Sequence, residues 1–567
     1  MHRRLRASCV LAFLALVFGP QARASANAPV AVEAFVAAPS AQTGDVGPGR
    51  ETPPSLPGET VLVPQDAATI QDAVDVAEPG GLVLIAPGVY REEVVVTTPF
   101  LTIRGLDRNE TILDGGFELN NAIRVSEADG VTIENLTARN YRQNGFLWSS
   151  VFGYRGSYLT AYNDGAYGLF AFDSAYGQFD HSYASGHPDS GFSIGQCQPC
   201  HAIVTDVLAE NNAFGFSGTN AGGALFVVNS EWRNNMAGIV PNTLDRESLA
   251  PQRDVVVAGN WVHDNNNAAA PAEQSQYPLF GNGIAVTGGR GNLVTQNLVE
   301  DHVNFGIAIL PGPEENLWLT ESNEVRDNLV RSSGDADLAL GAPAAGGDCF
   351  GDNDFSTSLP AAIQWRNGCG SWLRPMAGGS LGVSIGPLTR FLEANSAILA
   401  GDWRTQPDPR PLETMPAAAQ APPAPATPRA PDQQGGAVPQ RIQIRDARTL
   451  DVPASSNVSQ EVTVLGFSLA TGWWGVLIGL YAYALPLILY SAWISIALWD
   501  LVRQEAVPNS VRIAWMAGII AVPVLGPVAY YAFGRSPIQR SLRLMLVAGG
   551  LAIYLVLAAI GVAVGAS

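Results

Sequence analysis

Alternating apolar and polar positions recur at a regular interval through the middle of the chain. Stretches such as VTIENLTARN and NLVTQNLVEDH alternate as half-buried strands do, and Asn, Asp or Ser residues separate them. A glycine followed by an apolar residue comes next in each unit, at positions 145, 168, 191, 215, 238, 283 and 306. The spacing is 23 or 24 residues except for one interval of 45, which we interpret as close to two periods with an irregular insertion at 268–280.

A unit of this length cannot fold alone. It holds two or three short strands and no helix, so it cannot bury its own apolar face, and successive units must stack to form a continuous core. The pattern therefore predicts an all-β solenoid, the parallel β-helix. A leucine-rich repeat has a similar period, but leucine is sparse in this stretch and the consensus leucine spacing is missing.

The segment 59–105 predicts how the solenoid begins. Ile70, Val74 and Ala77 share one face of a short helix, and Thr69 and Asp72 have the spacing of an N-terminal cap. Such a helix would cover the open strand edge and apolar end of the first coil, ahead of strands in LVLIAPGVY, EEVVV and LTIRG. The segment resembles the N-terminal part of the pectin-lyase-like right-handed β-helix superfamily, and the likeness extends over about 59–400. The resemblance implies the fold and leaves the substrate open.

Composition divides the chain into five parts. A basic start, an apolar run and a small-x-small site at Ala22 to Ala24 predict a secretory signal. A second Pro- and Ala-rich stretch follows the repeats, and we expect it to be an extended, semi-rigid stalk. The expected parts are a signal peptide at 1–24, a disordered Ala/Pro-rich segment at 25–57, the β-helix at 58–402, the linker at 403–462 and a transmembrane module at 463–567.

The C-terminal part contains three apolar runs, at about 473–499, 513–533 and 544–564, each long enough to cross a bilayer as a helix. The sequence around the second run resembles the N-terminal two-helix module of phospholipase D and cardiolipin synthase-type proteins. Those enzymes need a His-x-Lys-x(4)-Asp motif, and this chain has no lysine. We therefore expect only a membrane anchor here, with the β-helix outside the cytoplasm at the cell membrane. The residues that carry the resemblance are Trp515, Pro523, Leu525, Gly526, Pro527, Tyr530, Phe533, Gly534 and Arg535.

Charge narrows the partners. The chain carries a net charge of −19, and both ends are positive, so the exported part between them is strongly acidic. An acidic surface repels phosphate backbones, which excludes nucleic acid as the expected partner. The expected partners are a polysaccharide and, through the apolar runs, the lipid bilayer.

Polar residues four and five positions before the repeating glycines are candidates for a binding stripe. Residues at one offset in successive coils stand about 4.8 Å apart, so they can face an extended polymer. Solvated turn positions and asparagine ladders that hold the coils together are the alternative interpretation. Trp232 or Trp261 would offer a sugar a stacking platform, unless they belong to the core. The candidate glycan contacts are His187, Asp189, Glu210, Arg233, Asp301 and His302.

No catalytic signature of the superfamily is intact. Gly186-His187-Pro188 lacks the second glycine of a polygalacturonase Gly-His-Gly element, and WVHDN and GHPDSG hold lyase and epimerase residue types in another order. His187 and Asp189 have the types of an acid/base pair, although a local turn hydrogen bond explains them as well. Catalytic residues stay unknown. The sequence favours a polysaccharide-binding protein, with a lyase, hydrolase or epimerase of divergent site as the alternative and a structural surface protein as the second.

Four cysteines remain after the signal. Cys197 with Cys200 and Cys349 with Cys369 form two local pairs, which predicts two disulfides in an exported protein. CQPCH also matches a c-type haem attachment pattern with His201 as ligand, but one short coil offers a haem no apolar pocket. No cofactor is expected, and Ca²⁺ has weak candidates in Asp348, Asp352 and Asp354.

Overall fold

The computed structural model describes residues 58–370, 379–386 and 401–426, together with parts of 463–547. The expected signal peptide, the segment 25–57 and the rest of the linker lie outside the described residues. The chain divides into two units, at 1–451 and 452–567.

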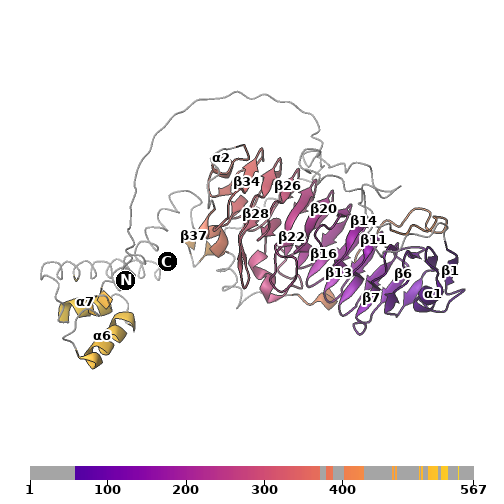
Figure 1. Cartoon of the computed structure of the whole chain (residues 1–567), viewed down its shortest axis with the longest axis horizontal. Coiled ribbons are helices and arrows are strands. Elements are labelled where there is room, and N and C mark those ends of the chain that lie inside the picture. The colour runs from indigo at the N-terminus through magenta and orange to yellow at the C-terminus, as the bar shows by residue number, and fades with distance from the viewer. Residues whose placement is uncertain are drawn as a thin grey trace, which may run out of the picture. The chain divides into compact units, whose positions relative to one another are not determined.

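The first unit is a parallel β-helix of three long sheets, as the sequence predicts (Figure 1). Each coil adds one strand to each sheet, so neighbours in a sheet are mostly three strands apart in the chain. We name the sheets A, B and C in the order in which a coil passes through them. Sheet A contains β1 (Thr60–Val63), β2 (Leu82–Ile85), β5 (Thr102–Gly105), β8 (Val131–Glu134), β11 (Phe152–Ser157), β14 (Ala175–Asp180), β17 (Ala202–Thr205), β20 (Gly222–Val228), β23 (Arg253–Ala258), β26 (Leu293–Thr295), β31 (Glu324–Arg326) and β34 (Cys349–Gly351).

The other two sheets are built in the same way. Sheet B contains β3 (Gly88–Tyr90), β6 (Thr111–Asp114), β9 (Thr137–Arg139), β12 (Thr160–Tyr162), β15 (Tyr183–Ser185), β18 (Leu208–Glu210), β21 (Glu231–Arg233), β24 (Trp261–His263), β27 (Leu298–Glu300) and β32 (Leu329–Arg331). Sheet C contains β4 (Val94–Val96), β7 (Asn121–Ser126), β10 (Asn144–Ser149), β13 (Tyr167–Phe172), β16 (Ser190–Gly195), β19 (Phe214–Thr219), β22 (Ala237–Asn242), β25 (Ile284–Thr287), β28 (Phe305–Leu310), β33 (Ala336–Leu340) and β35 (Ser358–Leu359).

The repeating glycines owe their period to close contact between coils. A Cβ atom built on Gly145 would lie 2.8 Å from the carbonyl oxygen of Gly168, and one on Gly168 would lie 2.6 Å from that of Gly191. Any side chain here would push the next coil away. The residues that follow, Phe146 and Leu169 among them, are paired across β10 and β13 and point into the core.

The long interval corrects one expectation. Ile239 of β22 pairs directly with Ile284 of β25, so the 45 residues form one enlarged coil rather than about two. Two insertions enlarge it, one between β22 and β23 and one between β24 and β25. The second insertion contains a 3-10 helix, η2 (Gln274–Leu279), and its Ala272 and Tyr277 pack with Ala237 and Val240 of β22.

Several corners between two sheets follow one design. A residue with positive φ turns the chain, as Asn140, Asn163 and Asn211 do between sheets B and C. The next residue points inward and hydrogen bonds to its counterpart in the neighbouring coil, as Asn212 donates to Asn235 over 2.9 Å. Asparagine suits both positions, because it tolerates positive φ and its amide both donates and accepts.

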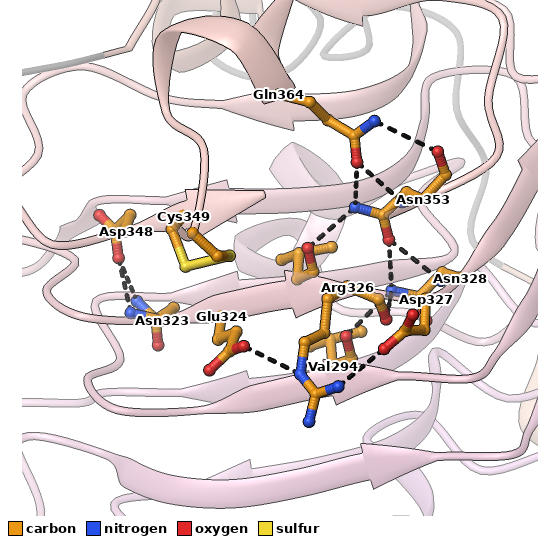
Figure 2. Close-up of a disulfide and its surroundings, with 12 residues drawn as sticks. Val294, Asn323, Glu324, Arg326, Asp327, Asn328, Asp348, Cys349, Asn353 and Gln364 are labelled. Carbon is orange, nitrogen blue, oxygen red and sulfur yellow. Dashed lines mark hydrogen bonds and ion pairs between the residues drawn. A yellow bond between two sulfur atoms is a disulfide. The ribbon is translucent and has the colours of Figure 1, made fainter. Parts of the chain in front are cut away.

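Both ends of the solenoid are closed. The helix α1 (Ile70–Val76) begins at the expected cap, where the Thr69 hydroxyl accepts from the Asp72 amide over 3.0 Å, and Ile70 and Val74 are buried. At the other end α2 (Ile363–Arg366) covers the last coil with Ile363. Figure 2 shows this end, where an amide ladder runs through Asn328 and Asn353 to Gln364 beside the disulfide of Cys349.

Part of the expected stalk does not stand free. Residues 401–426, with the short helix η3 (Trp403–Thr405), lie against the β-helix and hydrogen bond to its first coils. The physical reason is the set of long polar side chains on the outer face of those coils, which take the backbone carbonyls of this segment as acceptors.

The described part of the second unit includes the helices α6 (Asn509–Ala521) and α7 (Leu525–Phe533) and a short strand pair, β36 (Thr463–Val464) and β37 (Phe467–Ser468). The expected single run 513–533 is thus covered by two shorter helices. Among the residues that the structure describes, no helix reaches the length and hydropathy needed to span a bilayer. The other two expected runs lie almost entirely outside those residues.

Candidate functional site

The outer face of sheet B carries ionisable side chains on successive coils. Strand register places Glu210, Arg233, His263, Glu300 and Arg331 in one column. Acidic and basic members of the column form ion pairs: Arg233 Nε lies 2.8 Å from Glu210 Oε2, and Arg331 Nη2 lies 2.6 Å from Glu300 Oε2. We call this set, with Glu231 and Trp261 of the adjoining column, the sheet B ladder.

His263 is the titratable centre of the ladder. Its Nε2 lies 3.3 Å from Glu231 Oε1 and its Nδ1 lies 2.9 Å from Asp264 Oδ2. Burial acts to lower the pKa of His263, but the hydrogen bonds to Asp264 and Glu231 outweigh it and leave the pKa raised. The indole ring of Trp261 stacks on the imidazole at 4.0 Å between ring centroids.

A pocket adjoins the ladder where sheet A turns into sheet B. A second aromatic pair lies in its wall, the Tyr158 and His181 rings stacked at 4.6 Å. His181 Nδ1 lies 2.8 Å from Asp180 Oδ1, and this hydrogen bond raises the pKa of His181. Aromatic faces beside carboxylates are suited to a sugar ring with its hydroxyl groups. The other ionisable groups in the pocket wall are Arg108, Tyr183, Asp206, Glu231 and Glu413.

The structure brings together two of the six predicted glycan contacts. Glu210 and Arg233 lie side by side in the ladder, partly exposed. Asp301 has positive φ at the corner between sheets B and C, outside the ladder column. Trp261 lines the pocket, whereas Trp232 is buried in the core.

The expected exposed positions of His187 and His302 are wrong. Both side chains are buried in the corner ladder between sheets B and C, in register with Asp164, Asn212 and Asn265. Counting back from the glycines failed because coil length varies. His187 lies four residues before its glycine, but its neighbour in the next coil, Asn212, lies three before its own.

The hydrogen bonds of His187 show why it is buried. Its Nδ1 lies 2.8 Å from Asn212 Oδ1, which must accept because the Asn212 amide nitrogen already donates to Ala184 and Asn235. Its Nε2 lies 3.3 Å from Asp164 Oδ2. His187 therefore holds neighbouring coils together, and the sequence-based alternative of a ladder explains it.

Asp189 lies on a different side, at the start of sheet C. Its carboxyl group hydrogen bonds with the hydroxyls of Tyr167 and Ser190, and burial raises its pKa to about 6. The carboxylates of Glu247 and Glu273, one from each insertion of the enlarged coil, raise it further. Both ring nitrogens of His187 are engaged by Asp164 and Asn212 rather than by Asp189.

Both predicted disulfides are confirmed, Cys197 with Cys200 and Cys349 with Cys369. The bonded sulfurs leave the CQPCH pattern no free thiol for a haem. His201 stacks on Tyr176 at 4.7 Å instead.

The three aspartates considered for Ca²⁺ do not converge. Asp348 ends a corner ladder, where its carboxylate accepts from Thr320 and Asn323. Asp352 occupies a corner with positive φ, and the backbone of Asp354 pairs with the neighbouring coil. In the described part of the chain, one cluster of metal-binding residue types occurs, at Glu324, Cys349 and Cys369, and its two sulfurs form a disulfide.

Sequence reasoning did not find His181, Tyr158, Glu231 or His263. The signal was available in part, because WVHD places an aromatic residue and a histidine two apart on one strand face. The stacking of His181 on Tyr158 joins the corners of two successive coils. The two residues are 23 positions apart, so no local sequence pattern predicts their contact.

Comparisons with known proteins agree with this architecture. Residues 121–330 match the family model described as right-handed beta helix region, and residues 492–535 match the phospholipase D-nuclease N-terminal model. Both resemblances seen in the sequence are thereby confirmed. A search of curated proteins finds no significant match.

Solved structures with this fold have low sequence identity. The A-module of mannuronan C-5 epimerase AlgE4 from Azotobacter vinelandii is 14% identical, with 51% of this chain and 91% of that chain covered and a TM-score of 0.40. Pectate lyase Pel9A is 14% identical, with 64% and 90% covered and a TM-score of 0.32. The catalytic domain of a GH87 alpha-1,3-glucanase is 14% identical, with 55% and 67% covered and a TM-score of 0.32. Two separate parts of the chain are thus similar to known families, one to the right-handed beta helix region and one to the phospholipase D-nuclease N-terminal segment.

Proposed function

We propose that the protein binds a cell-envelope or extracellular polysaccharide on the sheet B ladder and its adjoining pocket, and that the C-terminal segment anchors it to the cell membrane. The observation that carries the proposal is the pair of aromatic stacks, Trp261 on His263 and Tyr158 on His181, set beside ion-paired carboxylates on successive coils.

The regular spacing of the coils makes this surface suitable for an extended polymer. Each coil offers new polar groups about 4.8 Å along the axis, so a chain of sugar residues meets donors and acceptors repeatedly. Arg233 is held by Glu210 and Glu231, with Nε and Nη1 at 2.8 and 2.6 Å, so it loses little conformational freedom when a ligand arrives. The surface is thus preorganised for an extended polar polymer.

Support for the anchor comes from the sequence of the second unit. The uncharged run 473–499 has the length of a membrane span, and the matched segment 492–535 overlaps its end. The sequence contains no lysine, so it lacks the lysine that a phospholipase D catalytic motif requires. We therefore propose an anchoring role for this segment and no phospholipase D activity.

Retention on immobilised polysaccharides tests the proposal. Full-length protein is passed over bacterial and plant polysaccharides, and Trp261→Ala is compared with Trp365→Ala, a change of a highly exposed tryptophan on α2 outside the ladder. Loss of one stacking platform should weaken retention about tenfold, since a stacking contact contributes about 1 kcal/mol or more. Equal retention by both variants, or no retention by wild type, would contradict the proposal.

A glycan-processing enzyme is the second candidate, favoured by Asp189. A carboxyl group with a pKa of about 6 beside the Tyr167 hydroxyl can exchange protons near neutral pH. Polysaccharide incubated with the protein should then gain new reducing or unsaturated ends. The Asp189→Asn variant should form none of these ends and should still be retained on the polysaccharide. A protein that neither binds nor cleaves any polysaccharide would be the structural surface protein.

A further inference from the structure

Residues 401–426 follow a defined path around the β-helix, and we call them the strap. The strap starts at the second insertion, where Gly401 donates to the Ala270 carbonyl, and Trp403 packs edge-on against Phe117. It reaches the corner between sheets A and B at Leu412 and ends at the corner between sheets C and A, where Ala426 donates to Gly130. The orange segment beside the first strands in Figure 1 belongs to it.

Arg104 is the main fixed point beneath the strap. It points outward from β5 and yet is fully buried. Its Nε and Nη2 pair with Glu134, and its terminal nitrogens donate to the carbonyls of Ala418, Ala421 and Pro422. Three of the oxygen atoms that satisfy this guanidinium come from the strap. A buried arginine left without acceptors is costly, so the pairing favours the docked strap strongly.

Amide and hydroxyl side chains of the first coils also hold the strap, in addition to Arg104. Asn109 accepts from the Leu412 amide over 2.8 Å and donates to the Leu412 carbonyl over 2.9 Å. Asn135 Oδ1 accepts from Met415 over 2.7 Å, and Thr102 Oγ1 accepts from Ala424 over 2.9 Å. These contacts use backbone groups of the strap, so they fix its path residue by residue.

The strap also completes the pocket beside the ladder. Leu412 and Glu413 line it, and Arg108 donates to the carbonyls of Glu413 and His181 over 3.0 and 2.9 Å. Burial lowers the pKa of Arg108 to about 10, still well above neutral pH, so the arginine stays charged and needs these acceptors.

We propose that the strap is a latch, which attaches the C-terminal part of the chain to the first coils of the β-helix and forms one wall of the pocket. Residues 379–386 lie beside the last coils, where Ser380 pairs with Gly341, whereas Ala426 lies beside Gly130 near the start of the solenoid. The docked strap therefore holds residue 426 at the N-terminal end of the β-helix. If the strap undocked, the pocket would lose the wall formed by Leu412 and Glu413, and residue 426 would at the same time be released from the first coils.

Hydrogen exchange of the full chain tests the latch directly. Four strap amides, those of Leu412, Met415, Ala424 and Ala426, bond only to groups of the β-helix. If the strap is docked, they should exchange about a hundredfold more slowly than in an unfolded peptide. Exchange at the rate of a free peptide would overturn the proposal.

A matched pair of strap variants separates docking from folding. Within the strap, Ala418 is buried and Ala419 is exposed. Ala418→Gln overfills the contact and should return the four amides to within about twofold of free-peptide exchange, whereas Ala419→Gln should leave them protected. Amides in β13 and β16 should stay protected in both variants. Equal protection of the strap in both would contradict the latch.

Cross-linking gives a second measurement if Ala418→Gln aggregates. Four of the five native cysteines form disulfides, so in a Cys9→Ser background a short bismaleimide reacts only with introduced thiols. Asn109→Cys with Leu412→Cys should cross-link in the full chain, and Asn316→Cys with Leu412→Cys, which joins the strap to a distant coil, should not. Equal yields from both pairs would overturn the docked path.

Discussion

At the scale of single residues, the same polar side chains serve two different purposes, and position in the coil decides which. A residue just after a corner points inward and joins a ladder, as His187 does with Asn212. A residue at the end of a sheet B strand points outward and joins the ion pairs, as Arg233 does with Glu210. Both kinds carry ionisable groups, so composition alone does not tell them apart.

Substitution of His187 should therefore destabilise the fold. His187→Ala leaves Asp164 and Asn212 without their buried partner, and we expect a loss of about 3–5 kcal/mol in the free energy of unfolding. Arg91→Ala, which removes one partner of an exposed ion pair with Glu118, should cost within about 0.5 kcal/mol. Denaturant unfolding of both variants checks this, and similar midpoints would contradict the buried role.

Asp189 gives the fold a pH dependence whose sign is fixed. Because the folded-state pKa, about 6, lies above the ordinary value of 3.8, the folded protein binds the proton more tightly than the unfolded chain does. The free energy of unfolding should then fall as pH rises from about 4 to 6. Asp189→Asn should raise it by roughly 1–3 kcal/mol at pH 7 and leave it unchanged below pH 4. The exposed Asp206→Asn is the control, and a gain that is equal at both pH values would refute the assignment.

At the scale of elements, close contact between neighbouring coils and the turns at the corners restrict which residues each coil can contain. A Cβ atom on six of the seven repeating glycines would lie within 3 Å of a carbonyl oxygen of the next coil, and asparagine and aspartate make up 14 of the 30 described non-glycine residues with positive φ. Both restrictions act on single positions, so the repeat can be recognised in the sequence. The capping helix α1 is legible for the same reason, since Thr69 and the buried Ile70 and Val74 lie within one turn of each other.

Replacing a repeat glycine should break one coil. A Cβ on Gly215 would lie 2.8 Å from the Gly238 carbonyl oxygen and 2.9 Å from the Trp232 ring, so Gly215→Ala forces two coils apart. We expect a loss of about 1–3 kcal/mol, the usual range for overpacking. Gly370→Ala, where no atom lies within 4 Å of the new Cβ, should be nearly neutral. Calorimetry that finds equal thermal midpoints for the two variants would contradict the contact.

What the sequence does not reveal is register between distant turns. The candidate column failed because one added residue before Gly215 and the enlarged coil before Gly283 shift the count, so Glu210 and Asp301 belong to different rows. The pocket also needs Leu412, about 300 residues from Arg108 in the chain. Any residue of the strap can supply a backbone carbonyl as an acceptor, so these hydrogen bonds require no particular side chain there. The Pro- and Ala-rich sequence of the strap therefore does not predict that it docks on the β-helix.

At the scale of the whole molecule, stability is shared between neighbours along one axis. Each coil contacts chiefly the coils before and after it, and a cross-link stabilises its own end most. The disulfide of Cys349 and Cys369 closes 20 residues at the C-terminal end, whereas that of Cys197 and Cys200 closes three in the middle.

Removal of the terminal disulfide should therefore loosen one end. Cys349→Ser with Cys369→Ser should lose about 3 kcal/mol of local stability, from the entropy of a loop of this length. Hydrogen exchange should speed up in β34 and β31 and stay unchanged in β5 and β8. Uniform acceleration along the solenoid would show instead that the whole β-helix unfolds as one unit.

The enlarged coil has a consequence for how this chain can vary. Ile284 pairs with Ile239 on one side and Ile307 on the other, so the sheets continue across the coil although it carries 22 residues more than its neighbours of 23. Its two corners therefore accept foreign sequence without disturbing the stack. They are sites where a new specificity can be grafted, or a native one lost, by insertion or deletion alone.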